Sequence, residues 1–176
     1  NLATSDNSRN CEEPAKLPLV FTVITGIKPD RLTKIIGLNT HGGMRKETSA
    51  MLSSGLAQRV LVADLNDLKN HLDTLNSAQA VTWGVTKDDS IEVCTQGDTQ
   101  ALQAGSIART RENFKFRDAP GVMMLDHDGL PDGELSAIQF RDRLIAAAPA
   151  LADAPMLWRP SASAGCVAPD GSILSG

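Results

Sequence analysis

Two aspartates one residue apart, Asp126 and Asp128, form the pattern with the clearest chemical potential in this sequence. They follow a short apolar run at residues 122–125, which predicts a buried strand that Gly129 and Pro131 terminate. Side chains at positions i and i+2 of a strand share a face, so both carboxylates would lie together at the rim of a sheet. Two close negative charges repel each other, and proteins relieve this by protonating one or by holding a hard divalent cation between them. The sequence therefore predicts a metal site; the alternative is a pair of carboxylates that cap a turn without metal.

A basic segment precedes the aspartates, with four cationic side chains in nine residues. Its first two members, Arg109 and Arg111, are suited to phosphate groups of a nucleotide or template, and the alternative is a solvated helix end. The loop that contains Ser161 and Ser163 also has two interpretations. Small hydroxyls and backbone amides can cradle a phosphate, and the same residues form ordinary exposed turns.

The elements that would position these side chains follow from apolar periodicity and turn residues. Strands are predicted at residues 19–24, 34–38, 57–63, 79–85, 91–95, 122–125 and 156–159. Helices are predicted at residues 65–75, 98–108 and 134–148, and the first and the last have an apolar face to bury. Asp64 and Asp98 are the expected N-caps of the first two helices. Strands interleaved with helices predict an α+β fold, a mixed α/β architecture with a central sheet flanked by helices.

Two connections between these elements are also predicted. Residues 79–85 and 91–95, separated by a charged turn, are expected to form a hairpin or two neighbouring strands. Residues 39–47, with a Gly-Gly pair and mixed charges, are expected to form a loop.

Composition limits the domain organisation and the classes of partner. The chain has 176 residues, of which 41% are hydrophobic, enough for one domain with a core. Residues 1–16 are polar and are expected to be a flexible leader before a single domain at residues 17–176. The first residue is Asn, and residues 173–176 look like an unfinished hairpin, so we expect an N-terminal fragment of a longer protein.

Charge, aromatic content and cysteine spacing exclude several kinds of site. A net charge of -4 argues against a nucleic-acid-binding surface over the whole chain, so any such surface must be local. Aromatic residues make up only 3%, which argues against base stacking as the main recognition device. Three widely separated cysteines indicate neither a disulfide framework nor a zinc ribbon. No apolar run approaches the length of a membrane span, so we expect a cytoplasmic protein with no membrane partner.

The order of these motifs resembles the archaeo-eukaryotic primase superfamily, particularly the primase-polymerase domains of phages, plasmids and other mobile genetic elements. The resemblance covers residues 32–163. In order, it rests on the strand beginning at Thr33-Lys34, the strand at residues 79–84, Arg109-Thr110-Arg111, Asp126-His127-Asp128, the helix from Glu134, and Ser161-Ala162-Ser163. The sequence departs from the family at Ser163, where a histidine is common. It also departs in the third metal carboxylate, which is either Asp170 or lies beyond the end of the chain.

The resemblance implies a fold and an enzymatic activity. The fold would be a primase-polymerase core of RRM-like type, incomplete at the C-terminus. The activity would be DNA primase or polymerase chemistry in DNA replication: nucleotidyl transfer on a single-stranded DNA template with Mg²⁺ or Mn²⁺. Asp126 and Asp128 would be the catalytic metal ligands, and the phosphate contacts would be Arg109, Arg111, Ser161 and Ser163. The implied partners are nucleoside triphosphates, the template and a fused or associated helicase.

Two other classes of protein stay open. Haloacid-dehalogenase-like phosphatases also carry an Asp-x-Asp pair, but their motif has a threonine where this chain has Leu130. Only 48 residues follow Asp128, and none of them is the lysine that such enzymes need. Other metal-dependent phosphohydrolases with an Asp-His-His motif match less closely, because the second histidine is absent. The last alternative is a non-catalytic nucleic-acid-binding or partner-binding module that keeps the primase fold.

Overall fold

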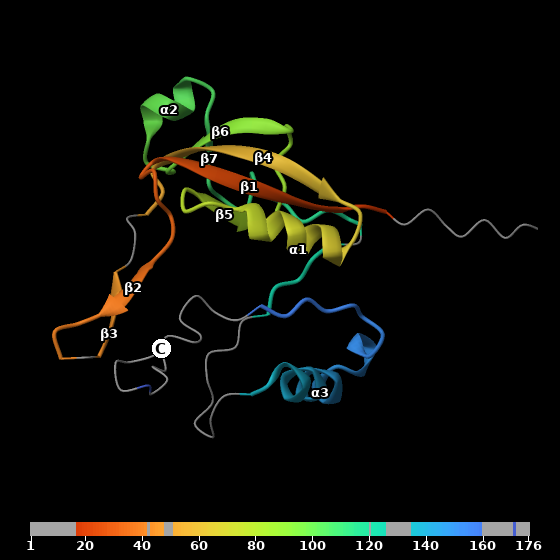
Figure 1. Cartoon of the computed structure of the whole chain (residues 1–176). Coiled ribbons are helices and arrows are strands. Elements are labelled where there is room, and N and C mark those ends of the chain that lie inside the picture. Colours follow the sequence, from red (N-terminus) through yellow and green to blue (C-terminus); the bar gives the residue numbers. More distant parts are fainter. Residues whose placement is uncertain are drawn as a thin grey trace, which may run out of the picture.

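The computed structural model describes residues 17–41, 43–47, 51–119, 121–125 and 135–159, together with Gly171. Its strands are β1 (Leu19–Lys28), β2 (Ile35–Leu38), β3 (Met44–Glu47), β4 (Ser54–Val62), β5 (Gln79–Thr82), β6 (Ser90–Cys94) and β7 (Ile107–Ala108). Its helices are α1 (Leu65–Thr74), α2 (Thr99–Gln103), α3 (Ala137–Ala147) and the 3-10 helix η1 (Pro149–Leu151). Figure 1 shows their arrangement, which confirms the predicted α+β class.

A five-stranded sheet in the order β5-β1-β4-β6-β7 forms the body of the fold. Neighbouring strands are antiparallel except for β6 and β7, which are parallel. β1 lies between β4 and β5, and both of these strands run antiparallel to it. β4 and β5 are therefore parallel to each other, and α1 connects them across β1 as a split β-α-β unit.

Helix α1 forms as the sequence predicts. The carboxylate of Asp64 accepts hydrogen bonds from the backbone N–H groups of Asn66, at 2.8 Å, and Asp67, at 3.0 Å. It thereby satisfies two donors that the first helical turn leaves without partners, which defines the N-cap. Leu68, on the apolar stripe, is only 1% exposed, so the helix is held by its burial against the sheet.

Apolar side chains gather on both faces of the sheet. The alternation along β1 directs Phe21 and Val23 to one face and Ile24 to the other. The cluster beneath α1, which we call the α1-side core, contains Phe21, Val23, Val62 and Leu68. The cluster on the other face, the opposite-side core, contains Ile24, Leu52, Ala57 and Val93, with Phe114 packed against it. The chain that leaves β7 therefore crosses this second face, and it then pairs with Val85 through the backbone of Lys115.

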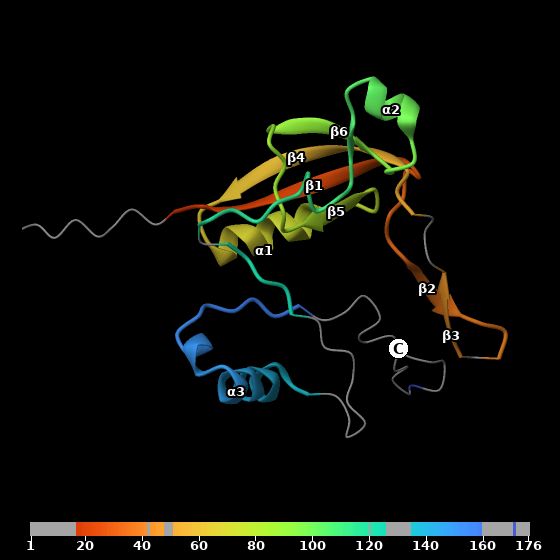
Figure 2. The ribbon, with the colours of Figure 1, turned by 180° about the vertical axis from the view of Figure 1, so that it is seen from behind.

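β2 and β3 form a separate two-stranded hairpin that projects from the body of the fold in both Figure 1 and Figure 2. The predicted strand at residues 34–38 is confirmed by β2. The loop predicted at residues 39–47 is wrong over its last four residues, since these are β3. The charged residues of β3 do not by themselves predict a strand, and their extended conformation is stabilised by pairing with β2.

Several other predictions need correction. The predicted strands at residues 79–85 and 91–95 overlap β5 and β6, but β5 and β6 are not neighbours, because β1 and β4 lie between them. The helix predicted at residues 98–108 has the expected Asp98 cap but is only the short α2, and β7 occupies its predicted end. Helix α3 is present with a capping box between Ser136 and Gln139. None of the residues of α3 is buried, and Ile138 is 73% exposed, so its predicted buried face is wrong.

Candidate metal and phosphate site

The predicted site residues divide into two groups. Asp126, Asp128, Ser161 and Ser163 lie outside the described residues, as does Asp170. Arg109 and Arg111 are described, and so are the segments at residues 121–125 and 156–159 that lead toward the aspartates and the serines. These two lead-in segments fix where on the fold the predicted site begins.

The lead-in to the aspartates is not a strand. Residues 121–125 pair with no strand that the structure describes, and Met123, Met124 and Leu125 are 64%, 65% and 46% exposed. Only Val122 packs against the α1-side core. The strand prediction at residues 122–125 is therefore wrong, and the arrangement of the two carboxylates that follow lies outside the described residues.

The lead-in to the serines reaches the same core. Residues 156–159 were also predicted as a strand and form none. Leu157 packs against the α1-side core, as Val122 does, and the ring of Trp158 lies 5.5 Å from that of Phe140 on α3. The two lead-in segments run close together below α1 in both Figure 1 and Figure 2. The chain thus enters both predicted motifs from one region of the fold.

An ion pair ties the second lead-in to α1. A guanidinium nitrogen of Arg159 lies 3.2 Å from a carboxylate oxygen of Asp73, whose other oxygen accepts a hydrogen bond from Lys69 at 2.8 Å. The Lys69 hydrogen bond is the main reason why the pKa of Asp73 lies below its ordinary value, and the positive charges of Lys69 and Arg159 lower this pKa further. Asp73 is therefore ionised near neutral pH, so the pair persists and weakens only as the pH falls through the lowered pKa.

Arg109 lies far from the aspartate lead-in. It follows β7, and its backbone N–H donates to Cys94 at the end of the sheet where β1 reaches Lys28. Val122 lies at the other end of β1, where it shares a small cavity of about 70 Å³ with Val20. Val20 and Lys28 are separated by about 26 Å of extended strand. The structure therefore does not bring Arg109 next to this lead-in.

The guanidinium of Arg109 also has a structural role. It donates a hydrogen bond of 2.7 Å to the backbone carbonyl of Leu52, a residue of the opposite-side core. A bond from a charged donor to a buried carbonyl fixes the segment before β4 onto the end of β7. Arg111, two residues further on, has an exposed side chain and is the better placed of the two for an external phosphate.

Exchange of each arginine for alanine should separate these roles. Arg109→Ala is expected to lower the free energy of unfolding by about 1–2 kcal/mol, because the Leu52 carbonyl loses its charged partner. Arg111→Ala is the matched control and should change this free energy by no more than about 0.5 kcal/mol. Urea denaturation followed by circular dichroism measures both values. Equal stability of the two variants would contradict the structural role of Arg109.

Sequence reasoning missed residues that suit the predicted chemistry. Arg117 lines the same small cavity as Gly121 and Val122, so it is a basic side chain beside the aspartate lead-in. Arg117 belongs to the basic segment noted in the sequence and is its member nearest to the aspartates, which was the available signal. Asp132 and Glu134 extend the aspartate pair to four carboxylates within nine residues, a number of oxygen donors that suits Mg²⁺, Mn²⁺ or Ca²⁺.

Other reactive groups in the described segments do not form a catalytic site. Burial raises the pKa of the Cys94 thiol, and the negative charge of Asp98 adds to this, so the thiol stays protonated and unreactive at neutral pH. His71 packs edge-on against Phe21, with ring centroids 5.4 Å apart. It lines a cleft of about 300 Å³ between α1 and the sheet, but its Nε2 atom is sealed from solvent.

The part of the chain that the structure describes contains no group of three or more His, Cys, Asp or Glu side chains able to hold a metal ion. Within the same segments, no helix has the length and apolar character that a membrane span requires. Comparison with models of protein families, with curated protein sequences and with solved structures gives no match for this chain.

Proposed function

We propose that this chain is a primase-polymerase domain that joins nucleotides on a single-stranded DNA template with Mg²⁺ or Mn²⁺. Asp126 and Asp128 would be the catalytic metal ligands. The chain would act in the cytoplasm, in the replication of a phage or another mobile element, with nucleoside triphosphates as substrates and a fused or associated helicase as partner. The family resemblance supplies these finer assignments.

The observation that carries the proposal is that Val122 and Leu157 pack against the same core. A nucleotidyl-transfer site needs metal ligands and triphosphate contacts within reach of each other. The aspartates begin four residues after Val122, and the first serine follows Leu157 by the same number. Because both motifs start a few residues from side chains that pack against the α1-side core, this packing supports a single site formed by the aspartates and the serines.

The donor set also supports the proposal. The aspartate lead-in itself provides no strand to position metal ligands. Asp132 and Glu134 would add two carboxylates close in sequence to the aspartate pair, and carboxylate oxygens are ligands that Mg²⁺ and Mn²⁺ prefer. Bound divalent ions would lower the pKa of the attacking hydroxyl and stabilise the leaving pyrophosphate.

The remaining residues would bind and orient the triphosphate. Ser161 and Ser163 would donate hydrogen bonds to phosphate oxygens, and Arg117 would add positive charge beside the aspartate lead-in. Arg111, two residues from Arg109, would contact a phosphate of the template instead of the triphosphate. Arg109 would act indirectly, because its guanidinium is already bonded to the Leu52 carbonyl.

A non-catalytic nucleic-acid-binding module is the second candidate. The absence of a strand at residues 121–125 favours it, because catalytic ligands are held more accurately on strands and helices than on loops. Such a module would bind single-stranded DNA but make no product.

Incubation of the full chain with a single-stranded template, nucleoside triphosphates and Mg²⁺ or Mn²⁺ tests the proposal. We expect template-dependent products that disappear when EDTA removes the metal. DNA binding without any product, with either metal, would favour the non-catalytic module. Release of phosphate from a small phosphomonoester, with no nucleotide incorporation, would favour a phosphohydrolase.

A further inference from the structure

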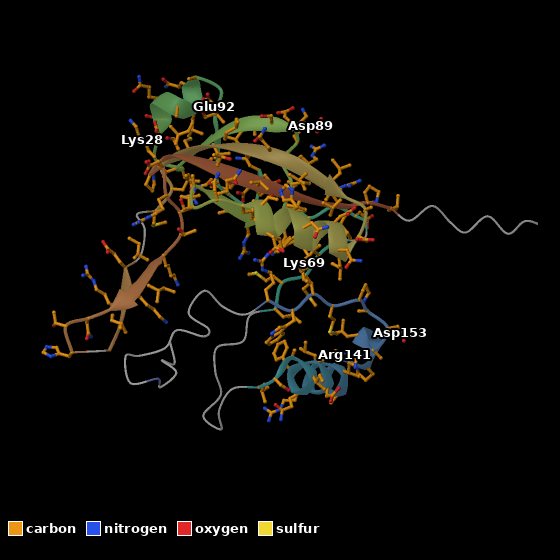
Figure 3. All side chains as sticks on the ribbon, in the orientation of Figure 1. Lys28, Lys69, Asp89, Glu92, Arg141 and Asp153 are labelled. Carbon is orange, nitrogen blue, oxygen red and sulfur yellow. The ribbon has the colours of Figure 1, made fainter. Side chains whose placement is uncertain are left out.

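The β2–β3 hairpin is a projecting arm with a defined base. The N–H of Leu32 donates to the carbonyl of Ser77 at 2.7 Å, and the side chain of Leu32 packs against the opposite-side core. On the other side of the base, the N–H and hydroxyl of Ser53 donate to the carbonyl of Lys28, at 2.7 and 2.8 Å. Among the described strands, the two beyond this base pair only with each other, and Figure 3 labels Lys28 at the point where the arm leaves β1.

The tip of the arm is also ordered by hydrogen bonds. The side-chain oxygen of Asn39 accepts hydrogen bonds from the backbone N–H groups of His41 and Gly43, both at 2.9 Å. The backbone N–H of Asn39 donates to the Gly43 carbonyl at 2.8 Å. A two-stranded hairpin is marginally stable in water when nothing packs against it. The arm is fixed at its base and tip, and no described element packs on the strands between them, so these strands are suited to contact another molecule.

The charge of the arm is opposite to that of the rest of the chain. Residues 28–47 contain five basic and two acidic side chains, a net charge of +3. Since the whole chain carries -4, the remaining residues carry -7. A local basic surface on an otherwise acidic protein attracts a polyanion to that surface.

The two faces of the arm differ in charge. On one face, Arg45 lies 3.6 Å from Glu47, so the charges compensate each other. On the other, Lys46 stands opposite Ile36. Lys34 directly precedes β2, two positions before Ile36, and the alternation of an extended chain would place it on the same face. Both lysines are exposed, and Glu47, the carboxylate of the described hairpin strands, lies on the other face, opposite Ile35. We call this the lysine face.

Lysines on exposed strands also discourage association between sheet edges. That role requires charge on the strand but not the segregation of one sign to one face. Segregation instead favours a ligand with a repeating negative charge, for which a nucleic-acid backbone is suited because its phosphates recur at regular intervals. Two apolar residues of β2 share this face: Ile36, which is half-buried opposite Lys46, and Leu38, which is exposed nearer the tip. The lysine face therefore combines positive charge with an apolar strip.

We propose that the lysine face binds the phosphate backbone of single-stranded DNA. This inference rests on the proposed function for the choice of DNA as the polyanion. It assigns to Lys34 and Lys46 a template contact that is separate from the aspartates and serines.

Fluorescence anisotropy with a labelled single-stranded oligonucleotide, over a series of NaCl concentrations and without divalent metal, tests this contact. The full chain with Lys34→Glu and Lys46→Glu is expected to bind at least about 10-fold more weakly at low salt. The slope of the logarithm of the binding constant against that of salt concentration should fall by about 1.4, since each lost contact with a single strand removes about 0.7.

Two controls make the result specific. Lys87→Glu with Arg143→Glu changes the net charge equally, at exposed positions outside the arm, and should retain most of the affinity. Lys34→Gln with Lys46→Gln should also weaken binding, and circular dichroism of each variant verifies its fold. Equal weakening in the arm and control variants would overturn the inference, and so would unaltered binding in both arm variants. A wild-type chain that binds vesicles of anionic lipid but not the oligonucleotide would overturn it too.

These outcomes are distinct from those that concern catalysis. DNA binding that depends on the two lysines, without nucleotide incorporation, would contradict the proposed enzymatic activity and support the proposed template contact. If the protein incorporates nucleotides but its DNA affinity does not change when the two lysines are replaced, the template contact is contradicted and the enzymatic activity is supported.

Discussion

Replacement of Asp126 and Asp128 together with asparagine is expected to slow metal-dependent nucleotide incorporation at least about 100-fold. Asparagine keeps the size of each side chain but removes the negative charge that binds a hard cation. Mn²⁺ binding, measured by titration calorimetry, should weaken in the same variant. The effect on rate and the effect on metal affinity are expected together, because both arise from the same lost ligands.

The matched control is Asp88→Asn with Asp153→Asn. These exposed aspartates lie on the described surface, with Asp153 labelled in Figure 3, and their exchange alters the net charge by the same amount. The control should keep most of the activity and the metal affinity. Further single variants, Asp132→Asn and Glu134→Gln, measure whether the rest of the carboxylate-rich stretch contributes. An Asp126 and Asp128 double variant as active as the control would remove the metal site from the proposal.

Replacement of Phe21 with alanine is expected to lower the free energy of unfolding by about 3–5 kcal/mol. Phe21 is fully buried on β1 and makes edge-on ring contacts with His71 and Trp83. Its loss leaves a cavity between α1 and the sheet, with the transfer free energy of the ring lost as well. Domains of this size are commonly stable by only about 5–15 kcal/mol, so this variant would be close to unfolding.

Phe116→Ala provides the comparison for Phe21. The Phe116 side chain is 78% exposed, so the same chemical change should cost no more than about 0.5 kcal/mol. Urea denaturation followed by tryptophan fluorescence and by circular dichroism reports on both variants. A Phe21 variant as stable as the Phe116 variant would mean that the α1-side core does not hold the sheet and α1 together.

Elements with local signals could be predicted from the sequence. β1 has a run of β-branched and aromatic residues, and α1 has both an apolar stripe and the Asp64 cap. Each of these signals acts within a few residues, and each element occurs where it was expected. The presence of strands and helices in one chain was enough to predict the α+β class.

Pairing between distant residues could not be predicted in this way. Nothing local to β5 indicates that it pairs with β1 rather than with β6, because the choice depends on α1 crossing the sheet first. β7 is two residues long, and its backbone pairs with β6 at Val93 and Cys94. So short a strand is defined by its partner and has little pattern of its own.

The two strands predicted beside the candidate site failed for a different reason. Residues 122–125 and 156–159 are apolar enough to be buried strands, but Val122 and Leu157 are the side chains through which they pack against the core. Met124 and Trp158 remain substantially exposed. A short apolar run does not by itself specify whether it buries all of its side chains or one of them. The two segments that lead to the candidate site are therefore apolar in sequence, but most of their side chains are exposed or only half-buried.

The central position of β1 determines which shortened forms of the protein can fold. A chain that began after Lys28 would keep β4, α1 and β5 but lose the strand between β4 and β5. Those two strands would then be separated by about 10 Å, twice the normal spacing, so they could not pair without displacement of α1. Any fragment made for expression or crystallisation must therefore begin before Leu19, however far its intended site lies from that residue.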